Sequence, residues 1–325
     1  METRVPLSRR HVLLATASLL ATGAARADEY PSRPVELIVP FTAGGGSDLL
    51  ARILGDGLAK RLGQPFVVIN RPGANTNIGM LAVARAKPDG QTLLIASVGL
   101  AANPSLYTRL GFDPLADLAP ITLLANSPTV LVVLPSLPVA SLPEFIAYAK
   151  AHPGELNYGS YGVGSGPHLA TELFMAMTGT KLVHIPYGGG GPAAVAAMTN
   201  QVQALFASVL PVLGMVRGKK LKAIAIAAEH RSPLLPDVPT FAESGLDYRT
   251  GTWFGLLAPA RTPAAIVATL HRETVAVLRE ATAHDRLAEQ GAEIVANTPD
   301  EFRAFTRDET DRLSKVIRAA KIQLD

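Results

Sequence analysis

Hydrophobic and polar positions along the chain alternate between two kinds of segment. Short apolar runs at residues 35–39, 66–69 and 92–96 have the length and composition of buried strands. Between them, residues 47–62 and 78–86 repeat apolar side chains at the three- and four-residue spacing of a helix face. Strands that alternate with helices in this way predict an α/β fold with a parallel sheet.

The same alternation continues through the rest of the chain. Two apolar runs between Ile121 and Leu134 are split by Asn126-Ser127-Pro128, and Ser141 to Glu144 has the composition of a helix start. The further strands that we expect are 156–160, 182–186, 204–206, 223–227 and 253–258, and the further helices are 167–178 and 192–199. Two helices are expected to finish the chain. Thr262 would cap the first, and a capping box at residues 298–301 would begin the second.

Residues 1–27 have the composition of an export signal. Arg9 and Arg10 precede an apolar stretch at residues 12–25, and Ala25-Arg26-Ala27 offers a cleavage site. We therefore expect cleavage after Ala27 and a periplasmic protein. The paired arginines resemble a twin-arginine signal, with an ordinary Sec signal as the alternative.

Charge and composition exclude several classes of function. Four of the 30 basic and one of the 27 acidic side chains lie in residues 1–27, so the remainder carries 26 of each sign. Residues 28–325 therefore have no excess positive charge, and the sequence does not predict a nucleic-acid-binding surface. The absence of cysteine excludes disulfides and thiol nucleophiles, and none of the seven histidines stands in a zinc-binding spacing. We expect neither a metal nor a cofactor.

Three glycine-rich segments each follow an expected strand and open an expected helix. They are residues 39–48, 158–168 and 185–192. Glycine lets backbone amides approach a ligand, and a helix N-terminus adds unpaired N–H groups and partial positive charge. Such turns lie at the carboxyl ends of strands, where open α/β sheets bind ligands. The pattern predicts a site for a small anion such as a carboxylate, with tight turns that merely need glycine as the alternative.

The sequence lacks the motifs of phosphate-binding loops, dinucleotide-binding folds and hydrolases. Residues 214–220 are one residue short of a phosphate-binding P-loop, and residues 162–167 end in proline where a dinucleotide fingerprint needs glycine. The G-x-S-x-G elbow of hydrolases is absent. The sequence therefore favours a binding protein over an enzyme. An α/β-hydrolase-type enzyme, with a triad assembled only by the fold, stays an alternative.

Three side chains near these segments allow more than one interpretation. Asp48 falls in the first turn of its helix, where we expect it to bond loop amides and stabilise the helix dipole rather than contact a ligand. His168 could donate to an anion or cap a turn, and the sequence does not decide between them. We expect Trp253 to pack in the core or at a hinge.

Five motifs, in order across nearly all of residues 28–325, resemble the Bug/TctC family, the extracytoplasmic solute-binding receptors of tripartite tricarboxylate transporters. They are residues 39–48 (VPFTAGGGSD), 70–74 (NRPGA), 87–92 (KPDGQT), 164–170 (GSGPHLA) and 235–240 (LPDVPT). The resemblance implies a type II-like periplasmic-binding-protein fold, in which two α/β lobes close over a ligand cleft. Residues 28–125 and 251–325 would form the first lobe and residues 126–250 the second.

The resemblance also implies a ligand and its contacts. Family members commonly bind di- and tricarboxylates, aromatic acids or acidic amino acids. By position, the first lobe would contribute Phe41, Thr42, Ala43, Gly44, Gly45, Asp48 and Ser97, and the second lobe Ser160, Gly164, Ser165, His168, Tyr187 and Ser208. Ala207 stands where many members have a polar residue, which favours plain organic acids over amino acids. The expected partners are a small carboxylate and the membrane subunits of a transporter, with the protein itself a monomer. A receptor for a signalling partner is the alternative.

Overall fold

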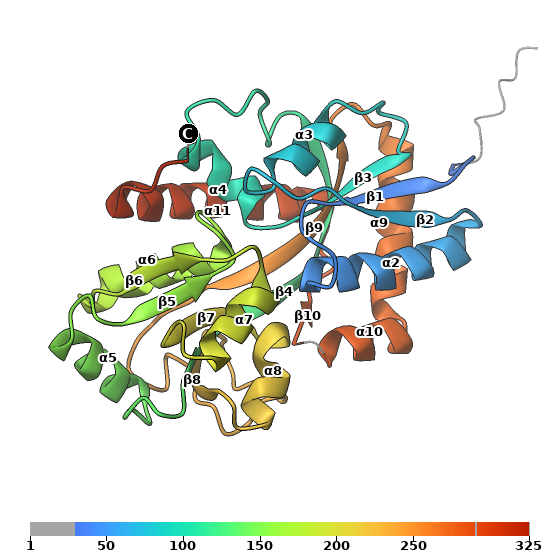
Figure 1. The fold of residues 1–325 in the computed structure, drawn as a ribbon. Coiled ribbons are helices and arrows are strands. Elements are labelled where there is room, and N and C mark those ends of the chain that lie inside the picture. The colour runs from blue at the N-terminus through green and yellow to red at the C-terminus, as the bar shows by residue number, and fades with distance from the viewer. Residues whose placement is uncertain (1–29, 290, 325) are drawn as a thin grey trace, which may run out of the picture.

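The computed structural model describes residues 30–289 and 291–324 of the chain (Figure 1). The predicted signal and its cleavage after Ala27 lie outside the described residues. No helix in the described ranges is long and apolar enough to cross a membrane.

The first of two sheets is built on parallel strands whose carboxyl ends face the middle of the molecule. Its strands, in spatial order, are β2 (Phe66–Asn70), β1 (Val35–Val39), β3 (Thr92–Ala96), β9 (Gly251–Pro259) and the first part of β4 (Leu118–Val133), with which the short strand β10 (Glu293–Ile294) also pairs. The first three are parallel and β9 is antiparallel to β3. Helices on this sheet are α2 (Gly46–Leu62), α3 (Asn77–Ala84), α4 (Gly99–Leu106), α9 (Ala264–Arg279), α10 (Ala281–Ala288) and α11 (Pro299–Ala320). We call this half the first lobe.

The second sheet repeats the plan in the other half of the molecule, the second lobe (Figure 1). Its strands are β7 (Ala204–Ser208), β5 (Asn157–Ser160), β6 (Val183–Pro186) and β8 (Lys222–Ile226). Its helices are α5 (Leu142–Ala151), α6 (Gly166–Thr178), α7 (Gly190–Met198) and α8 (Val209–Arg217). Two α/β lobes were expected from the sequence, and this fold class is confirmed.

Alternate residues of the same strand are buried on opposite faces of each sheet. In β1, Leu37 packs toward α2 and α9, while Ile38 packs toward α3, α4 and α11. In the second lobe, Leu131 faces α5 and α6, while Val132 faces α7 and α8. Strands covered by helices on both faces read as continuous apolar runs, which is why the sequence identified them.

The long strand β4 (Leu118–Val133) joins the two lobes. It pairs with β9 from Leu118 to Pro128 and with β7 and β8 beyond that point. The two apolar runs that the sequence separates at Asn126-Ser127-Pro128 therefore form one continuous strand. The predicted lobe boundaries at 125/126 and 250/251 stay a prediction; β4 changes partners after Pro128, close to the first, and β9 begins at Gly251, at the second.

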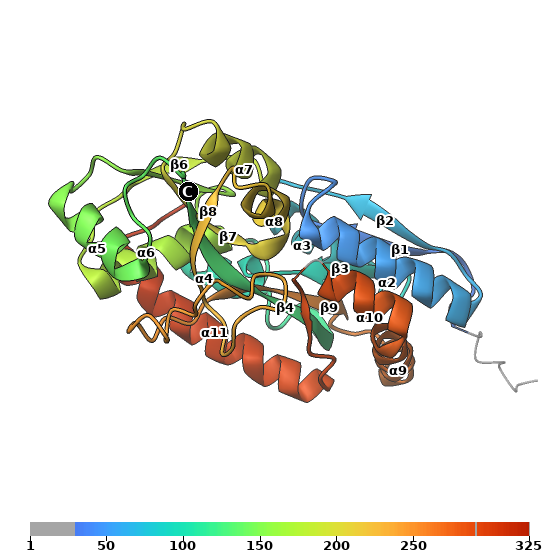
Figure 2. The same cartoon turned by 90° about the horizontal axis from the view of Figure 1, so that it is seen from below.

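The C-terminal part differs from the sequence prediction in two respects. Three helices follow β9, not two, because the chain becomes extended at Glu280 and then restarts as α10. Thr262 does not cap α9, since Pro263 takes that position without a side-chain cap. The capping box of Thr298 and Glu301 is confirmed at the start of α11. In Figure 2, α11 runs beneath both lobes, and it packs on α4 and α6.

Trp253 is a core residue, as the sequence predicts. It is 3% exposed and packs edge-on against Phe302 and Phe305 of α11. The contact joins β9, which is paired with β4, to a helix that packs on both lobes.

Candidate functional site

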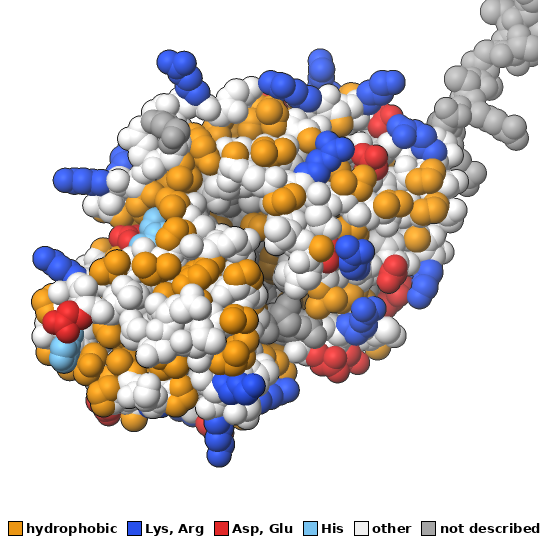
Figure 3. Space-filling model, in the orientation of Figure 1, with side chains coloured by type: hydrophobic (Ala, Val, Ile, Leu, Met, Phe, Trp, Pro, Cys, Tyr) orange, Lys and Arg blue, Asp and Glu red, His pale blue; other side chains and the backbone are white. Residues whose placement is uncertain are grey.

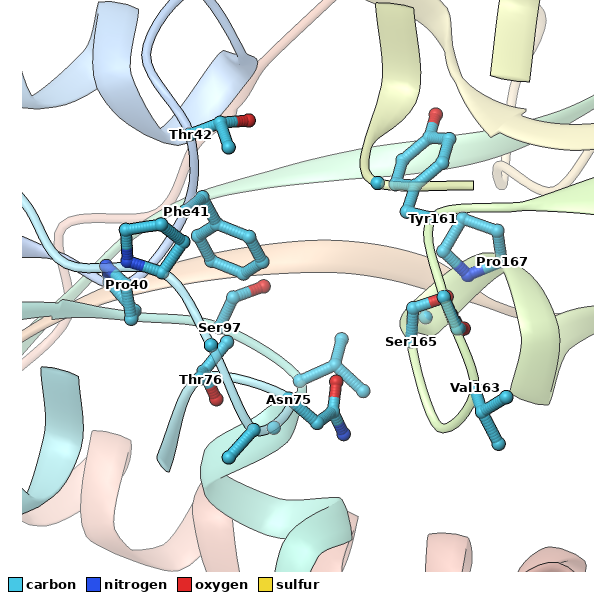
Figure 4. Close-up of a pocket in the computed structure, with 18 of the residues that line it drawn as sticks. Pro40, Phe41, Thr42, Asn75, Thr76, Ser97, Tyr161, Val163, Ser165 and Pro167 are labelled. Atoms are coloured by element: carbon cyan, nitrogen blue, oxygen red, sulfur yellow. Dashed lines mark hydrogen bonds between the residues drawn. The ribbon is translucent and has the colours of Figure 1, made fainter. Parts of the chain in front are cut away.

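A cavity of about 460 Å³ lies between the lobes. First-lobe residues 40–42, 72–76 and 97–99 line one side of it, and second-lobe residues 161–163 and 165–167 line the other. Figure 4 shows Phe41, Ser97 and Asn75 facing Tyr161 and Ser165 across this space. The remaining lining residues are Tyr107, Tyr187, Gly188, Thr252 and Leu324.

None of the described residues that line the cavity has a charged side chain. In Figure 3 the surface is hollowed between the lobes, and most Lys, Arg, Asp and Glu side chains lie around the outside. The lining combines aromatic rings and prolines with a few hydroxyls and one carboxamide, that of Asn75. A ligand here must find its polar partners among neutral groups.

Helix N-termini from both lobes meet this cavity. Thr76, Val98 and Ser165, which precede the first residues of α3, α4 and α6, all line it. Gly188 lies one residue before the corresponding position of α7 and lines it too. Each helix start adds unpaired N–H groups and a partial positive charge. The cavity therefore favours an anion even without a basic side chain.

Five of the predicted binding residues line the cavity: Phe41, Thr42, Ser97, Ser165 and Tyr187. The other eight are not among its lining residues; they are Ala43, Gly44, Gly45, Asp48, Ser160, Gly164, His168 and Ser208. All three glycine segments do open helices, namely α2, α6 and α7, as the sequence predicts.

Two lining residues that are at most 5% exposed have a hydroxyl without a hydrogen-bond partner within the part of the chain that the structure describes. Ser97 is 4% exposed, and no hydrogen bond joins its side chain to another described residue. The hydroxyl of Thr76, 5% exposed, is likewise unpartnered. Buried hydroxyls normally have partners, so these two are candidates for ligand contact.

Asp48 has the structural role that its position predicts. Its carboxylate accepts hydrogen bonds from the Gly44 amide, the Asn70 side chain and the Arg52 guanidinium, all at 3.0 Å. Burial alone would raise the pKa of Asp48, but these hydrogen bonds and the charge of Arg52 hold that pKa below its usual value. The carboxylate therefore holds the first glycine segment in place without lining the cavity.

His168 also bonds a loop and is not one of the cavity's lining residues. Its Nδ1 accepts a hydrogen bond from the Gly164 amide at 3.0 Å, and its ring stacks on His184 at a centroid distance of 4.0 Å. Burial, together with the neighbouring His184, lowers the pKa of His168 to about 3. Burial lowers the pKa of His184 to about 4. Both rings are thus neutral near pH 7, and of the two open interpretations the structure favours His168 as a turn cap.

Two serines of the second glycine segment are engaged with the loop itself. Ser160 is fully buried; its Oγ lies 2.6 Å from Nε2 of His184 and accepts from the Gly162 amide at 3.1 Å. Ser165 lines the cavity, and its hydroxyl donates to the Gly162 carbonyl at 2.7 Å. These bonds fix the loop that presents the start of α6.

The sequence analysis missed one wall of the cavity, residues 72–76. Gly73, Ala74, Asn75 and Thr76 all have positive φ, at 126°, 45°, 45° and 78°. Such a run is rare outside glycine and often marks a functional segment. The available signal was Asn70-Arg71-Pro72-Gly73-Ala74, a cluster of turn residues at the carboxyl end of a strand.

No group of three or more His, Asp or Glu side chains that could hold a metal ion occurs among residues 30–289 and 291–324.

Comparison with known proteins identifies the family. The family model described as "Tripartite tricarboxylate transporter family receptor", TctC, matches residues 50–322. The chain belongs to the TctC family. Among TctC relatives, the protein BugT of Bordetella pertussis is 40% identical over 316 residues, which are 96% of each chain.

Solved structures of similar proteins agree with this assignment. Rpa4515 of R. palustris with adipate is 36% identical, with a TM-score of 0.86, over 90% of this chain and 99% of that chain. MatC from Rhodopseudomonas palustris with bound malate is 33% identical, with a TM-score of 0.82, over 89% of this chain and 100% of that chain. Both are thus similar to this TctC protein along almost the whole of their chains.

Proposed function

We propose that this TctC-family protein is a periplasmic receptor that binds a small organic carboxylate between its lobes and delivers it to a tripartite tricarboxylate transporter. The observation that carries the proposal is the neutral cavity on which helix N-termini from both lobes converge. The relatives that hold adipate and malate support the same ligand class. Cleavage after Ala27 would release the mature form, and its role would be binding without catalysis.

The proposed contacts come from both lobes. Thr42 and Ser97 would donate from the first lobe and Tyr187 from the second, next to the amides at the starts of α3, α4 and α6. Ser165, whose hydroxyl hydrogen already bonds the Gly162 carbonyl, would present the start of α6 to the ligand. The other predicted residues would shape the loops, as Asp48 does. Because no described lining residue carries a carboxylate, a ligand ammonium would lack a charged partner. A plain organic acid is therefore favoured over an acidic amino acid.

A thermal-shift screen tests this proposal. Organic acids would be compared with their neutral amides, and native mass spectrometry of freshly purified protein would identify any acid that co-purifies. We expect acids to raise the melting temperature and the matched amides to leave it unchanged, because helix N-termini select for negative charge. Preference for a sugar or a cationic amino acid would show the assignment to be wrong.

A pair of variants locates the binding site. Ser97→Asp places a negative charge in the cavity and should abolish the response to acids. Ser136→Asp makes the same change at an exposed position outside the cavity lining and should leave the response intact. Equal responses in both variants would exclude this cavity as the carboxylate site.

A further inference from the structure

The side chain of Asn75 reaches from the first lobe to the second. One of its amide hydrogens is directed to Oδ1 of Asn103 at 2.7 Å and the other to the carbonyl of Gly164 at 3.3 Å. Gly164 belongs to the loop that precedes α6 in the second lobe. This hydrogen bond therefore exists only while the two lobes are close together.

Asn103 of α4 holds Asn75 in position. Asn103 is fully buried, and its amide donates to the Asn75 carbonyl and to Oδ1 of Asn77, both at 2.7 Å. Together the carboxamides of Asn75 and Asn103 use all four of their N–H groups. A fully satisfied buried network of this kind fixes side-chain geometry. The left-handed backbone at Asn75, with φ of 45°, is held by the same bonds.

Gly164 is shaped for close approach by the first lobe. A Cβ added to it would lie 2.6 Å from Cδ1 of Leu106, 2.8 Å from Nδ2 of Asn75 and 3.0 Å from Cδ1 of Leu324. All three atoms belong to the first lobe. A side chain at position 164 of the second lobe would therefore contact the first lobe most closely. The amide of Leu324 bonds the carbonyl of Leu106 at 2.7 Å, which places both leucines over the same glycine.

We propose that Asn75 is the closing contact of this receptor: with Asn103 as its positioning residue, it hydrogen-bonds the Gly164 carbonyl and holds the lobes shut over the cavity. The inference rests on the proposed function, because the cavity that it closes is the one assigned to the carboxylate. It gives Gly164 a role in closure in place of the ligand contact expected from sequence. An interaction made only in the closed state slows opening and hence ligand release, with little effect on encounter.

Asn75→Gly is the test variant, with Asn200→Gly as its matched control. Glycine adopts the left-handed backbone freely and keeps the carbonyl that Asn103 binds. The variant therefore removes the two side-chain hydrogen bonds of Asn75, to the Gly164 carbonyl in the other lobe and to Oδ1 of Asn103, and keeps the backbone contact. Asn200 is also left-handed, at φ of 61°, but is exposed and lies in the second lobe after α7. In stopped-flow measurements, Asn75→Gly should raise the dissociation rate about two- to tenfold. The association rate, and both rates of Asn200→Gly, should stay within about twofold of wild type.

Gly164→Ala tests the same contact from the other lobe. Its methyl group would separate the lobes, so affinity should fall about tenfold or more. Affinity equal to that of wild type in this variant would refute the close approach. So would a dissociation rate unchanged by Asn75→Gly.

Interlobe distances give a measurement that does not depend on any ligand. The chain has no cysteine, so Asp56→Cys on α2 and Val195→Cys on α7, both at exposed positions, provide the two spin-label sites for pulsed electron paramagnetic resonance. We expect Asn75→Gly and Gly164→Ala to move the distance distribution toward longer values with or without carboxylate. Identical distributions in wild type and both variants would overturn the closing contact. Failure of every carboxylate to bind would instead overturn the proposed function, and the distances of the unliganded variants would still decide the inference.

Discussion

Removal of the Ser97 hydroxyl should weaken ligand binding and leave the stability of the unliganded protein almost unchanged. Ser97 is 4% exposed at the cavity wall, and its side chain forms no hydrogen bond with another described residue. A hydrogen bond to a charged ligand is worth about 1.5–3 kcal/mol. Ser97→Ala should therefore raise the dissociation constant roughly 10- to 150-fold. The unliganded protein has no partner to lose, so its free energy of unfolding should change by less than about 0.5 kcal/mol.

Isothermal titration calorimetry with the tightest acid from the screen measures the first quantity, and urea titration measures the second. Ser160→Ala is the matched comparison, because Ser160 is fully buried and bonded to His184 and Gly162. It should lower the free energy of unfolding by about 1 kcal/mol or more and change the dissociation constant less than Ser97→Ala does. If Ser97→Ala bound the acid within twofold of wild type, the assignment of its free hydroxyl to the ligand would be refuted.

Three further predictions concern stability. Thr298→Ala removes the capping box of α11 and should lower the free energy of unfolding in urea by about 1 kcal/mol. Asp48→Asn removes the charge that accepts the Gly44 amide and should cost about 1–3 kcal/mol in the same titrations. Buried His168 and His184 have pKa values of about 3 and 4, below the ordinary 6.5, so the unfolded chain takes up protons at a higher pH than the folded one. Stability present above pH 6.5 should thus be lost as the pH falls toward 4, and calorimetry should show a shallower loss in His168→Gln. An unchanged urea midpoint in either of the first two variants, or an equal pH dependence with and without His168, would contradict the corresponding argument.

The elements that sequence predicts well are those whose local signals agree with their burial. The strands β1 and β3 begin and end where their apolar runs do, since both faces are covered by helices. The capping box of Thr298 is a local pattern and needs no tertiary contact. The glycine segments open helices for a local reason too, because Gly44 before α2 and Gly162 and Gly164 before α6 have backbone angles that only glycine adopts readily.

What sequence misses depends on contacts between distant segments. The helix α4 contains Pro104 in its interior, which argues locally against a helix, yet α4 is held by packing on its sheet. Sequence could place Gly164 in a ligand loop. It could not show that Leu106 and Leu324, far away in the chain, approach that glycine. For Asp48 and His168 the bonds to the loops are local, to Gly44 and Gly164 four residues earlier, and only the further partners Asn70 and His184 depend on the fold.

The uninterrupted course of β4 determines how the two halves can move. Paired with β9, it forms a twisted ribbon whose register shifts near Thr122 and Ala125, irregularities that increase local twist. Such a ribbon resists twisting. A rotation of one lobe against the other would be spread along the length of β4 and β9 and opposed by their pairing. In a receptor that closes on its ligand, part of the binding free energy would go into twisting this ribbon. Substitutions that stiffen or relax the ribbon, at Trp253 for example, would then change the affinity without touching the ligand.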